Sequence, residues 1–396
     1  MHSSSDAPIL YFDANATTPV CAEALAAMLP LLQEHFGNAS SAHAMGRAPA
    51  AAVARAREQV AQLLGAQESS EVVFTGGGTE SLNAVLHAAA ERAPGRPRLL
   101  FSAGEHSAVL KPAERLAAKL GLELVPIPLD SQGRIQVDAA LGALDGRSAL
   151  LSLIHANNET GVHLEGAQIQ RLAERAREVG AWFHLDCVAS AGKLPLEANR
   201  WGVDLVTIAP HKFYGPKGVG VLWVRRGLEF TPLLIGGSQE AGRRAGTLNS
   251  AGLAGAGAAA EVARRFAADG ARVQGQAALR DRFERELVAR VPQARALGQS
   301  APRIFNTSCL VFPGVTGESA QALLSEYGVC VSSGSACGSA KRKGSHVLLA
   351  MGVPPSEATS TLRFSFLRGL TASEVDTGLE RTAQALEHLY ALAPSR

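Results

Sequence analysis

Apolar, β-branched runs alternate with amphipathic helical patterns over residues 47–225 of this 396-residue chain. The runs are "EVVFTGG", "RLLFSAGEH", "LELVPIPLD", "SALLSLIHANNETG", "AWFHLDC", "DLVTIAPHK" and "VGVLWVRR". Between the fourth and fifth runs, "EGAQIQRLAERAREVG" repeats apolar residues at helical spacing. Strands that alternate with helices form a largely parallel sheet with helices on its faces. The sequence therefore predicts an α/β fold whose ligands bind at the carboxyl ends of the strands.

The pattern changes after this region. A long helical pattern rich in arginine and glutamate covers about 252–292, and it is followed by the strand-like "NTSCLVFPG", a loop and the strand-like "TLRFSF". We interpret this part as a smaller α+β domain joined by a long helix. The predicted large domain is 16–255, and the predicted small domain combines 1–15 with 256–396.

Charge and cysteine content exclude several classes of function. The formal net charge is only +2, and no basic stripe is interleaved with aromatic residues, so we expect no direct nucleic-acid substrate. The start, "MHSSSDAPIL", lacks a basic segment followed by an apolar one, and we expect a cytoplasmic protein without a membrane segment. The five cysteines form no CxxC pair, which predicts neither a disulfide framework nor a metal site. These cysteines are Cys21, Cys187, Cys309, Cys330 and Cys337.

A glycine-rich turn predicts an anion site. In "FTGGGTES", three glycines including Gly78 separate a strand end from Thr79, which opens a helical pattern. Glycines allow a close approach of the backbone, and a helix start offers unpaired N–H groups to an anion. The motif matches neither the dinucleotide nor the P-loop pattern and favours a smaller phosphate ester. A tight turn with Thr79 as a helix cap is the alternative.

Lys212 is the lysine best placed for chemistry. The chain has only seven lysines, and Lys212 ends "DLVTIAPHK", a buried-looking strand that precedes a glycine-rich turn. Partial desolvation lowers the pKa of a lysine in such a place and suits it to forming a Schiff base. Taken alone, Lys212 also fits a solvated lysine at a strand end.

Three further strand ends have polar side chains that complement this lysine. Asp186 ends "AWFHLDC", where a buried carboxylate needs a cationic partner such as the pyridinium nitrogen of pyridoxal phosphate. His106 in "SAGEHSAV" offers a flat ring and proton transfer near neutrality. Asn158 in "HANNETG" offers an amide to a ring oxygen and a substrate carboxylate. Each residue alone also fits a structural role, but together they predict a pyridoxal phosphate site.

One cysteine occupies a segment that cannot bury an apolar face. "SSGSACGSAKRKGSH", residues 332–346, places Cys337 among serines and glycines, which predicts a mobile surface loop. Three basic residues follow at 341–343; they could lower the pKa of the thiol or attract an acidic partner, and simple solvation of the loop is the alternative.

At this point the sequence closely resembles the cysteine desulfurases of the NifS/IscS-like group. This group belongs to the class V aminotransferase-like branch of the fold-type I pyridoxal phosphate enzymes, which have the aspartate-aminotransferase-like fold. The resemblance implies a large domain with a mostly parallel mixed sheet and a homodimer with shared active sites. It rests on "YFDANATTPV", "FGNASSAHAMGR", "VVFTGGGTES", "EHSAVL", "HANNETGV", "FHLDCVASAGKLP", "PHKFYGPKGVGVLWVRRG", "GGSQEAGRRAGTLN", "SSGSACGSA" and "TLRFSF".

The resemblance also implies residue roles around pyridoxal 5'-phosphate. Lys212 would form the Schiff base with the cofactor, Asp186 would pair with the pyridine nitrogen, and His106 would stack on the ring. The phosphate would be held by Gly78, Thr79 and His211, together with Thr247 of the partner subunit.

For the reaction itself, the resemblance implies that L-cysteine becomes L-alanine while its sulfur moves to the protein. Arg363, helped by Asn158, would bind the substrate carboxylate, and Cys337 would be the nucleophile that becomes a persulfide. A sulfur-acceptor protein, either a scaffold or a carrier, would then receive the sulfur for iron–sulfur cluster assembly or thiolation.

Two positions depart from the family pattern. Ala189 occupies a position where the family usually has a glutamine near the cofactor ring, and Ala209 replaces a usual phosphate-binding serine. These departures leave open another pyridoxal phosphate enzyme of class V, such as a selenocysteine lyase, a β-lyase or an aminotransferase. A non-catalytic sulfur-transfer scaffold is a further alternative.

Overall fold

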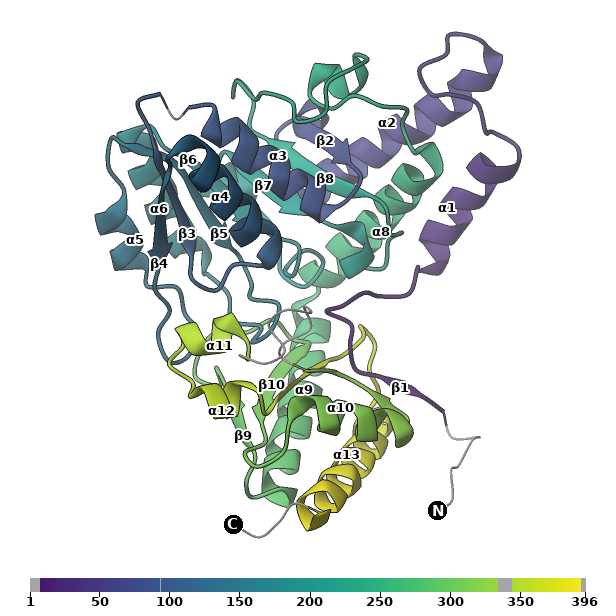
Figure 1. Ribbon diagram of the computed structural model, residues 1–396. Helices are drawn as coiled ribbons and strands as arrows, with labels where there is room; N and C mark the ends of the chain where they lie inside the picture. Colours follow the sequence, from purple (N-terminus) through teal and green to yellow (C-terminus); the bar gives the residue numbers. More distant parts are fainter. Residues whose placement is uncertain (1–7, 93, 334–343, 393–396) are drawn as a thin grey trace.

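A computed structural model describes residues 8–92, 94–333 and 344–392. Figure 1 shows a larger body built around a sheet and a smaller body below it, with the first described residues alongside the smaller body. The largest core of the larger body is separate from the largest core of the smaller body, which matches this division.

The large domain is built on a seven-stranded sheet, and each of its strands falls in one of the seven apolar runs. The two pairings of β8, with β2 and β7, are antiparallel and the other four pairings are parallel, so the sheet is mostly parallel, as predicted. In spatial order the strands are β2 (Val72–Thr75), β8 (Gly220–Val224), β7 (Leu205–Ile208), β6 (Trp182–Asp186), β5 (Ser148–Ile154), β3 (Arg98–Ser102) and β4 (Glu123–Ile127).

Helices cover both faces of this sheet, which explains why its central strands are apolar on both sides. In β5, Leu151 packs in the core that includes α2, α6 and α8, whereas its neighbour Leu150 packs with α3 and α4 on the other face. The helices of the large domain are α1 (Ala22–Gln33), α2 (Ala44–Leu64), α3 (Gly78–Ala90), α4 (Ser107–Leu120), α5 (Val137–Ala143), α6 (Gly166–Val179), α7 (Ala198–Trp201) and α8 (Ser250–Ala268). Short 3₁₀ turns lie at η1 (Ser69–Glu71), η2 (Pro210–Lys212) and η3 (Gln239–Gly242).

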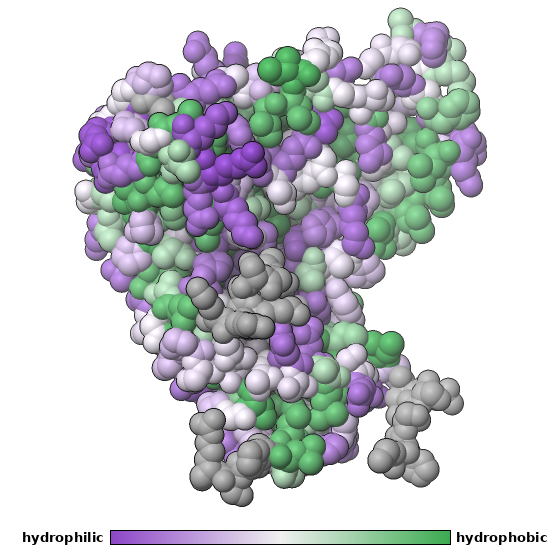
Figure 2. Space-filling model, viewed as in Figure 1, coloured by the Kyte–Doolittle hydropathy of each residue, from purple (hydrophilic) through white to green (hydrophobic). Residues whose placement is uncertain are grey.

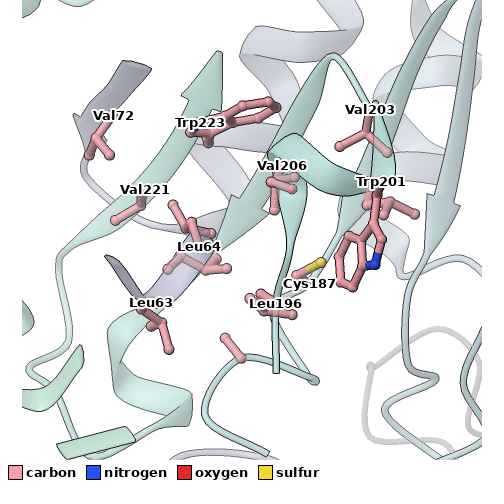
Figure 3. Packing of buried hydrophobic residues seen from close by; sticks show 14 of the residues in the cluster. Leu63, Leu64, Val72, Cys187, Leu196, Trp201, Val203, Val206, Val221 and Trp223 are labelled. Atoms are coloured by element: carbon pink, nitrogen blue, oxygen red, sulfur yellow. The ribbon is translucent and has the colours of Figure 1, made fainter. Parts of the chain in front are cut away.

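The core that contains residues of α2, α6 and α8 also accounts for the burial of one cysteine, Cys187. Figure 3 shows Cys187 among Leu196, Trp201 and Val206 in the apolar cluster beneath the sheet. Burial raises the pKa of the Cys187 thiol, so this thiol stays protonated and packs as a small apolar side chain.

The predicted long helix is in fact two helices. Helix α8 ends at Ala268, and α9 (Gly270–Arg290) begins after Asp269, whose side chain accepts a hydrogen bond from the backbone N–H of Arg272. An aspartate before a glycine favours such a new helix start over continuation. Helix α8 packs against α1 and α2, and its Ala256–Ala263 face lies in the core of the large domain. The predicted boundary at residue 255 therefore falls inside α8, and we propose that the large domain extends to the end of this helix.

The small domain contains a four-stranded antiparallel sheet and a two-stranded parallel pair. The sheet order is β12 (Ser332–Ser333), β13 (Thr361–Ser365), β10 (Thr307–Val311) and β9 (Arg295–Leu297), and β1 (Leu10–Tyr11) pairs with β11 (Val329–Cys330). Its helices are α9, α10 (Gly317–Glu326), α11 (His346–Ala350), α12 (Pro355–Ala358) and α13 (Ala372–Leu392). Because Ser332 pairs with Arg363 across β12 and β13, the start of the cysteine segment lies beside a predicted substrate-binding residue.

Within the part of the chain that the structure describes, no helix combines the length and apolarity that a bilayer span requires.

Candidate active site

A cavity of about 500 Å³ lies where the two domains meet, at the carboxyl ends of the central strands. This volume is ordinary for a cofactor or small-molecule site. The large domain supplies most of the lining, and the small domain supplies Arg363 and residues of β12 and α11. The predicted site residues that line it are Gly78, Thr79, His106, Asn158, Asp186, His211, Lys212 and Arg363.

Lys212 is placed by the 3₁₀ turn that follows β7. Its Nζ donates hydrogen bonds to the backbone oxygens of Asn15 (2.6 Å) and Ala16 (2.8 Å). Burial, reinforced by the charge of Arg363, lowers the pKa of Lys212 to about 8. About a tenth of this amine is therefore uncharged at pH 7, far more than for an ordinary lysine, and the uncharged form is the one that attacks an aldehyde.

Asp186 ends β6 with its carboxylate inside the cavity wall. The residue is 3% exposed, and Oδ1 accepts a hydrogen bond from the backbone N–H of Val188 at 2.9 Å. Burial raises the pKa of Asp186 to about 6. Among the described residues, no cationic side chain forms an ion pair with this carboxylate, so a cationic ring nitrogen would be a fitting partner.

His106 caps the N-terminus of α4. Its Nδ1 accepts a hydrogen bond from the backbone N–H of Ala108 at 3.1 Å, which leaves the proton of the neutral ring on Nε2. Burial, together with the charge of Lys212, lowers the pKa of His106. The ring is therefore uncharged at neutral pH, and its protonated nitrogen is defined.

The N-terminus of α3 forms a small cradle at one end of the cavity. A Cβ atom placed on Gly78 would lie 3.2 Å from Cγ2 of Val188 and 3.5 Å from Cβ of Ala209, so a larger residue would fill this space. His211 lies nearby, with Nδ1 3.2 Å from Oγ1 of Thr17. Burial and the surrounding lysines lower the pKa of His211 to about 4, which keeps the ring neutral. Helix α3 has 13 residues, and the unpaired backbone N–H groups at its N-terminus suit a phosphate group.

Arg363 enters the cavity from β13 of the small domain. Its Nη1 donates to the backbone oxygen of Asn158 at 3.2 Å, and its Nη2 donates to Oδ1 of Asp13 at 2.7 Å. The structure thus brings Arg363 and Asn158 together through the backbone of Asn158. The predicted role of the Asn158 amide stays a prediction.

Two predicted residues are not on the described cavity wall. Thr247 is exposed and does not line the cavity of its own chain, and its predicted contribution to a partner subunit stays a prediction. Cys337 lies outside the described residues. The residues on either side of its segment, Ser332 and Ser333 before it and Ser345 after it, all line the cavity.

Several residues of this site had no predicted role. Asn15, 4% exposed, donates from Nδ2 to Oγ1 of Thr307 at 2.8 Å and links the N-terminal segment to β10. Lys193 is a second buried lysine in the cavity wall, and its Nζ donates to the backbone oxygen of Ala189 at 2.8 Å. Burial lowers the pKa of Lys193 to about 7. The scarcity of lysine was the signal that could have marked Lys193.

Two glutamates also belong to the cavity wall: Glu105 is buried, and Glu159 is half-buried. Glu105 accepts a hydrogen bond at Oε1 from the backbone N–H of Ile154 at 2.6 Å, and burial raises the pKa of Glu105 well above its usual range. Glu159 interacts electrostatically with Arg363, and burial raises the pKa of Glu159 as well. Among the described residues, no cluster of three His, Cys, Asp or Glu side chains is suited to a metal ion.

The fold and the cavity define an α/β enzyme whose site contains a desolvated lysine facing a buried carboxylate. The family described as "Aminotransferase class-V" matches residues 10–377. The chain belongs to this family, as the resemblance in its sequence implied.

Similar proteins cover nearly the whole chain. A cysteine desulfurase of Cereibacter sphaeroides is 45% identical over 97% of each chain. A solved structure of a NifS-like protein superimposes with a TM-score of 0.88 and 33% identity, covering 96% of this chain and all of that one. A second structure, "SspA in complex with cysteine", has a TM-score of 0.79 and 30% identity, covering 91% of this chain and 99% of that one.

Proposed function

We propose that this protein is a pyridoxal phosphate-dependent cysteine desulfurase, which converts L-cysteine to L-alanine and forms a persulfide on Cys337. The observation that supports it most strongly is that Lys212, Asp186, His106 and Arg363 line one cavity beside both ends of the Cys337 segment. The cysteine desulfurase names of relatives that span nearly the full chain support the same substrate.

The described residues fit the proposed cofactor. The cradle at Gly78 and Thr79, with neutral His211 beside it, would hold the phosphate. Asp186 would pair with the ring nitrogen, and Lys212 would bind the aldehyde carbon. When bound, pyridoxal phosphate supplies an electron sink for bond breaking at the substrate's Cα and Cβ.

The chain's own side chains then position the substrate. The planar guanidinium of Arg363 would bind the carboxylate of L-cysteine. The amine of Lys212, with its pKa near 8, can take and return the proton at Cα. His106 is held neutral, the form that can accept a proton during turnover.

The proposed sulfur transfer balances without an added oxidant. The Cys337 thiolate attacks the substrate sulfur, so an S–S bond forms while the Cβ–S bond of the substrate breaks. A proton added at Cβ completes L-alanine, and the protein keeps the sulfur as a persulfide. An acceptor protein, a scaffold or carrier of iron–sulfur cluster assembly or thiolation, would receive this sulfur in the cytoplasm.

We also propose a homodimer with shared active sites. Exposed apolar residues gather on α1 and near it, where Figure 2 shows a green surface. They include Leu25, Leu29, Leu32 and Phe36, and the last is 71% exposed. Burying such an apolar face against a second copy of the chain is more favourable than leaving it exposed to water. In that arrangement, the exposed Thr247 would reach the phosphate end of the other cavity.

The decisive experiment measures alanine released from L-cysteine in the presence of a reductant and saturating pyridoxal phosphate. The wild type should release alanine and sulfide. Cys337→Ala should lose this activity, while the control Cys330→Ala, a partly exposed cysteine of the small domain, should retain it. Equal turnover by Cys337→Ala would refute the persulfide mechanism. A screen of amino acids that yields only α-keto acids would favour an aminotransferase instead.

A further inference from the structure

Two acidic residues, Asp13 and Glu159, interact with the guanidinium of Arg363, and only Asp13 forms an ion pair with it among the described residues. Asp13 accepts the hydrogen bond from Nη2 at 2.7 Å. Glu159 is close enough for its charge to interact with Arg363, and its Oε2 is buried without a hydrogen-bond partner among the residues that the structure describes. The Arg363 side chain is only 7% exposed, so water offers it little alternative solvation.

Asp13 itself is rigidly placed. Its backbone forms a bridge with Ser365 of β13, and the backbone N–H of Ala14 donates to the oxygen of Ser365 at 2.8 Å. Its carboxylate also accepts a hydrogen bond from Oγ of Ser332 at 2.9 Å. Asp13 is therefore fixed from two sides by the same sheet that holds Arg363.

This fixed carboxylate leaves room for a ligand on the arginine. A guanidinium has five N–H groups, and the described contacts use one on Nη1 and one on Nη2. Three N–H groups remain, including the buried Nε–H, which has no partner among the described residues. A substrate carboxylate can thus bind while Asp13 keeps its hydrogen bond.

Removing Asp13 would change where the arginine points. A buried cation that loses its ion-pair partner turns toward the nearest remaining carboxylate, because an uncompensated buried charge is costly. Glu159 is such a carboxylate, because its charge interacts with Arg363 and its Oε2 has no hydrogen-bond partner among the described residues. The guanidinium would then be neutralised in a geometry set by Glu159 rather than by β13.

We infer that Asp13 is a positioning residue that holds Arg363 toward the cavity, against the pull of Glu159, so that the arginine can bind an amino-acid carboxylate. The inference rests on the proposed function, because it assigns that carboxylate to the substrate. It predicts that Asp13 matters for ligands with a carboxylate and not for amines without one.

The test uses L-alanine, the proposed product, and ethylamine, which is the same molecule without its carboxylate. Binding of each to the pyridoxal phosphate-loaded protein is followed by the change in cofactor absorbance, without turnover. Asp13→Asn should weaken L-alanine binding about tenfold, the effect of one strong hydrogen bond. Ethylamine binding should change by less than about twofold.

Two further variants sharpen the test. Asp13→Asn combined with Glu159→Gln should recover most of the lost L-alanine affinity, because the competing carboxylate is gone. Ser332→Ala keeps the charge of Asp13 but removes the hydrogen bond that Ser332 donates to it, so it should cause a smaller loss of affinity that affects L-alanine and not ethylamine. This variant replaces Asp13→Asn in the test if Asp13→Asn fails to fold.

The outcomes separate this inference from the proposed function. A wild type that binds neither amine with an absorbance change would overturn both. A wild type that prefers L-alanine, combined with an Asp13→Asn variant that keeps the same preference, would overturn the positioning role alone. Equal weakening of L-alanine and ethylamine, or no recovery in the double variant, would also contradict it.

Discussion

At the scale of single residues, the cavity places Lys212 and Asp186 where burial disfavours their charged forms. The pKa of the lysine falls to about 8, and that of the aspartate rises to about 6. Both shifts cost folding free energy in the protein alone, and a ligand that bonds the amine and offers a cation to the carboxylate relieves both. Lys212 and Asp186 therefore lower the stability of the ligand-free fold and increase the affinity for a ligand that relieves their shifts.

Asp186→Asn should therefore separate stability from binding. The folded-state pKa of about 6 lies above the unfolded value of about 3.9, so the penalty is absent below pH 4 and grows as the pH rises to 6. It amounts to roughly 3 kcal/mol at neutral pH. Urea unfolding of the cofactor-free protein at pH 7.5 should show the variant to be more stable by up to that amount.

The same variant should bind pyridoxal phosphate more weakly, because the neutral amide offers no charge to the ring nitrogen. Lower stability of the cofactor-free variant, or unchanged cofactor affinity, would contradict the role given to Asp186. Thermal unfolding with and without cofactor provides the second half of this comparison.

The pKa of Lys212 predicts how cofactor attachment depends on pH. Only the uncharged amine attacks an aldehyde, and this form is scarce below the pKa and dominant above it. The rate of pyridoxal phosphate attachment to the cofactor-free protein should therefore rise with a midpoint near pH 8. Stopped-flow absorbance measures it directly. A midpoint near 10.5, the usual value for lysine, would show that Lys212 is solvated.

At the scale of elements, the cradle depends on the close approach of β8 to the turn before α3. A Cβ atom on Gly220 would lie 2.3 Å from the backbone carbon of Gly77, so the turn would have to move. Gly220→Ala should cost roughly 1–3 kcal/mol of stability and weaken cofactor binding. Gly142→Ala in α5, where a Cβ would meet nothing within 4 Å, is the matched control.

For this pair of variants, isothermal titration with pyridoxal phosphate reports affinity, and urea unfolding reports stability. The control should be neutral or slightly stabilising, because alanine favours helices over glycine. If Gly220→Ala bound the cofactor as tightly as the control, the cradle would not depend on this contact.

The elements themselves were largely predictable, because burial on both faces makes each parallel strand a continuous apolar run. The break between α8 and α9 was missed, since the helical pattern continues on both sides of Asp269 and the Asp269-Gly270 pair, whose aspartate caps α9, was the one local signal of the break. Local sequence likewise predicted Lys212 and Asp186. Local sequence did not indicate that Asp13 would form an ion pair with Arg363, since 350 positions separate the two residues.

At the scale of the whole molecule, neither domain holds a complete site. Lys212 and Asp186 come from the large domain, while Arg363 comes from the small one. The N-terminal segment connects them, because β1 pairs in the small domain and Asn15 then contacts Lys212. The cavity therefore depends on how the two domains are packed.

The proposed dimer makes a prediction about mass. The wild type should sediment at about twice the 41.2 kDa of one chain. Leu25→Asp combined with Leu32→Asp should shift the protein toward monomer, because two charges would enter an apolar interface. Leu120→Asp on α4 introduces a charge at a similarly exposed leucine and should leave the mass unchanged. A monomeric wild type would contradict the shared site.

The most direct test of the central claim identifies the lysine that bonds the cofactor. Pyridoxal phosphate is added, the Schiff base is reduced with borohydride, and the modified peptide is located by mass spectrometry. The account predicts the adduct on Lys212, with loss of the adduct in Lys212→Ala. An adduct on Lys193, the second buried lysine of the same cavity, or no specific adduct at all, would contradict it.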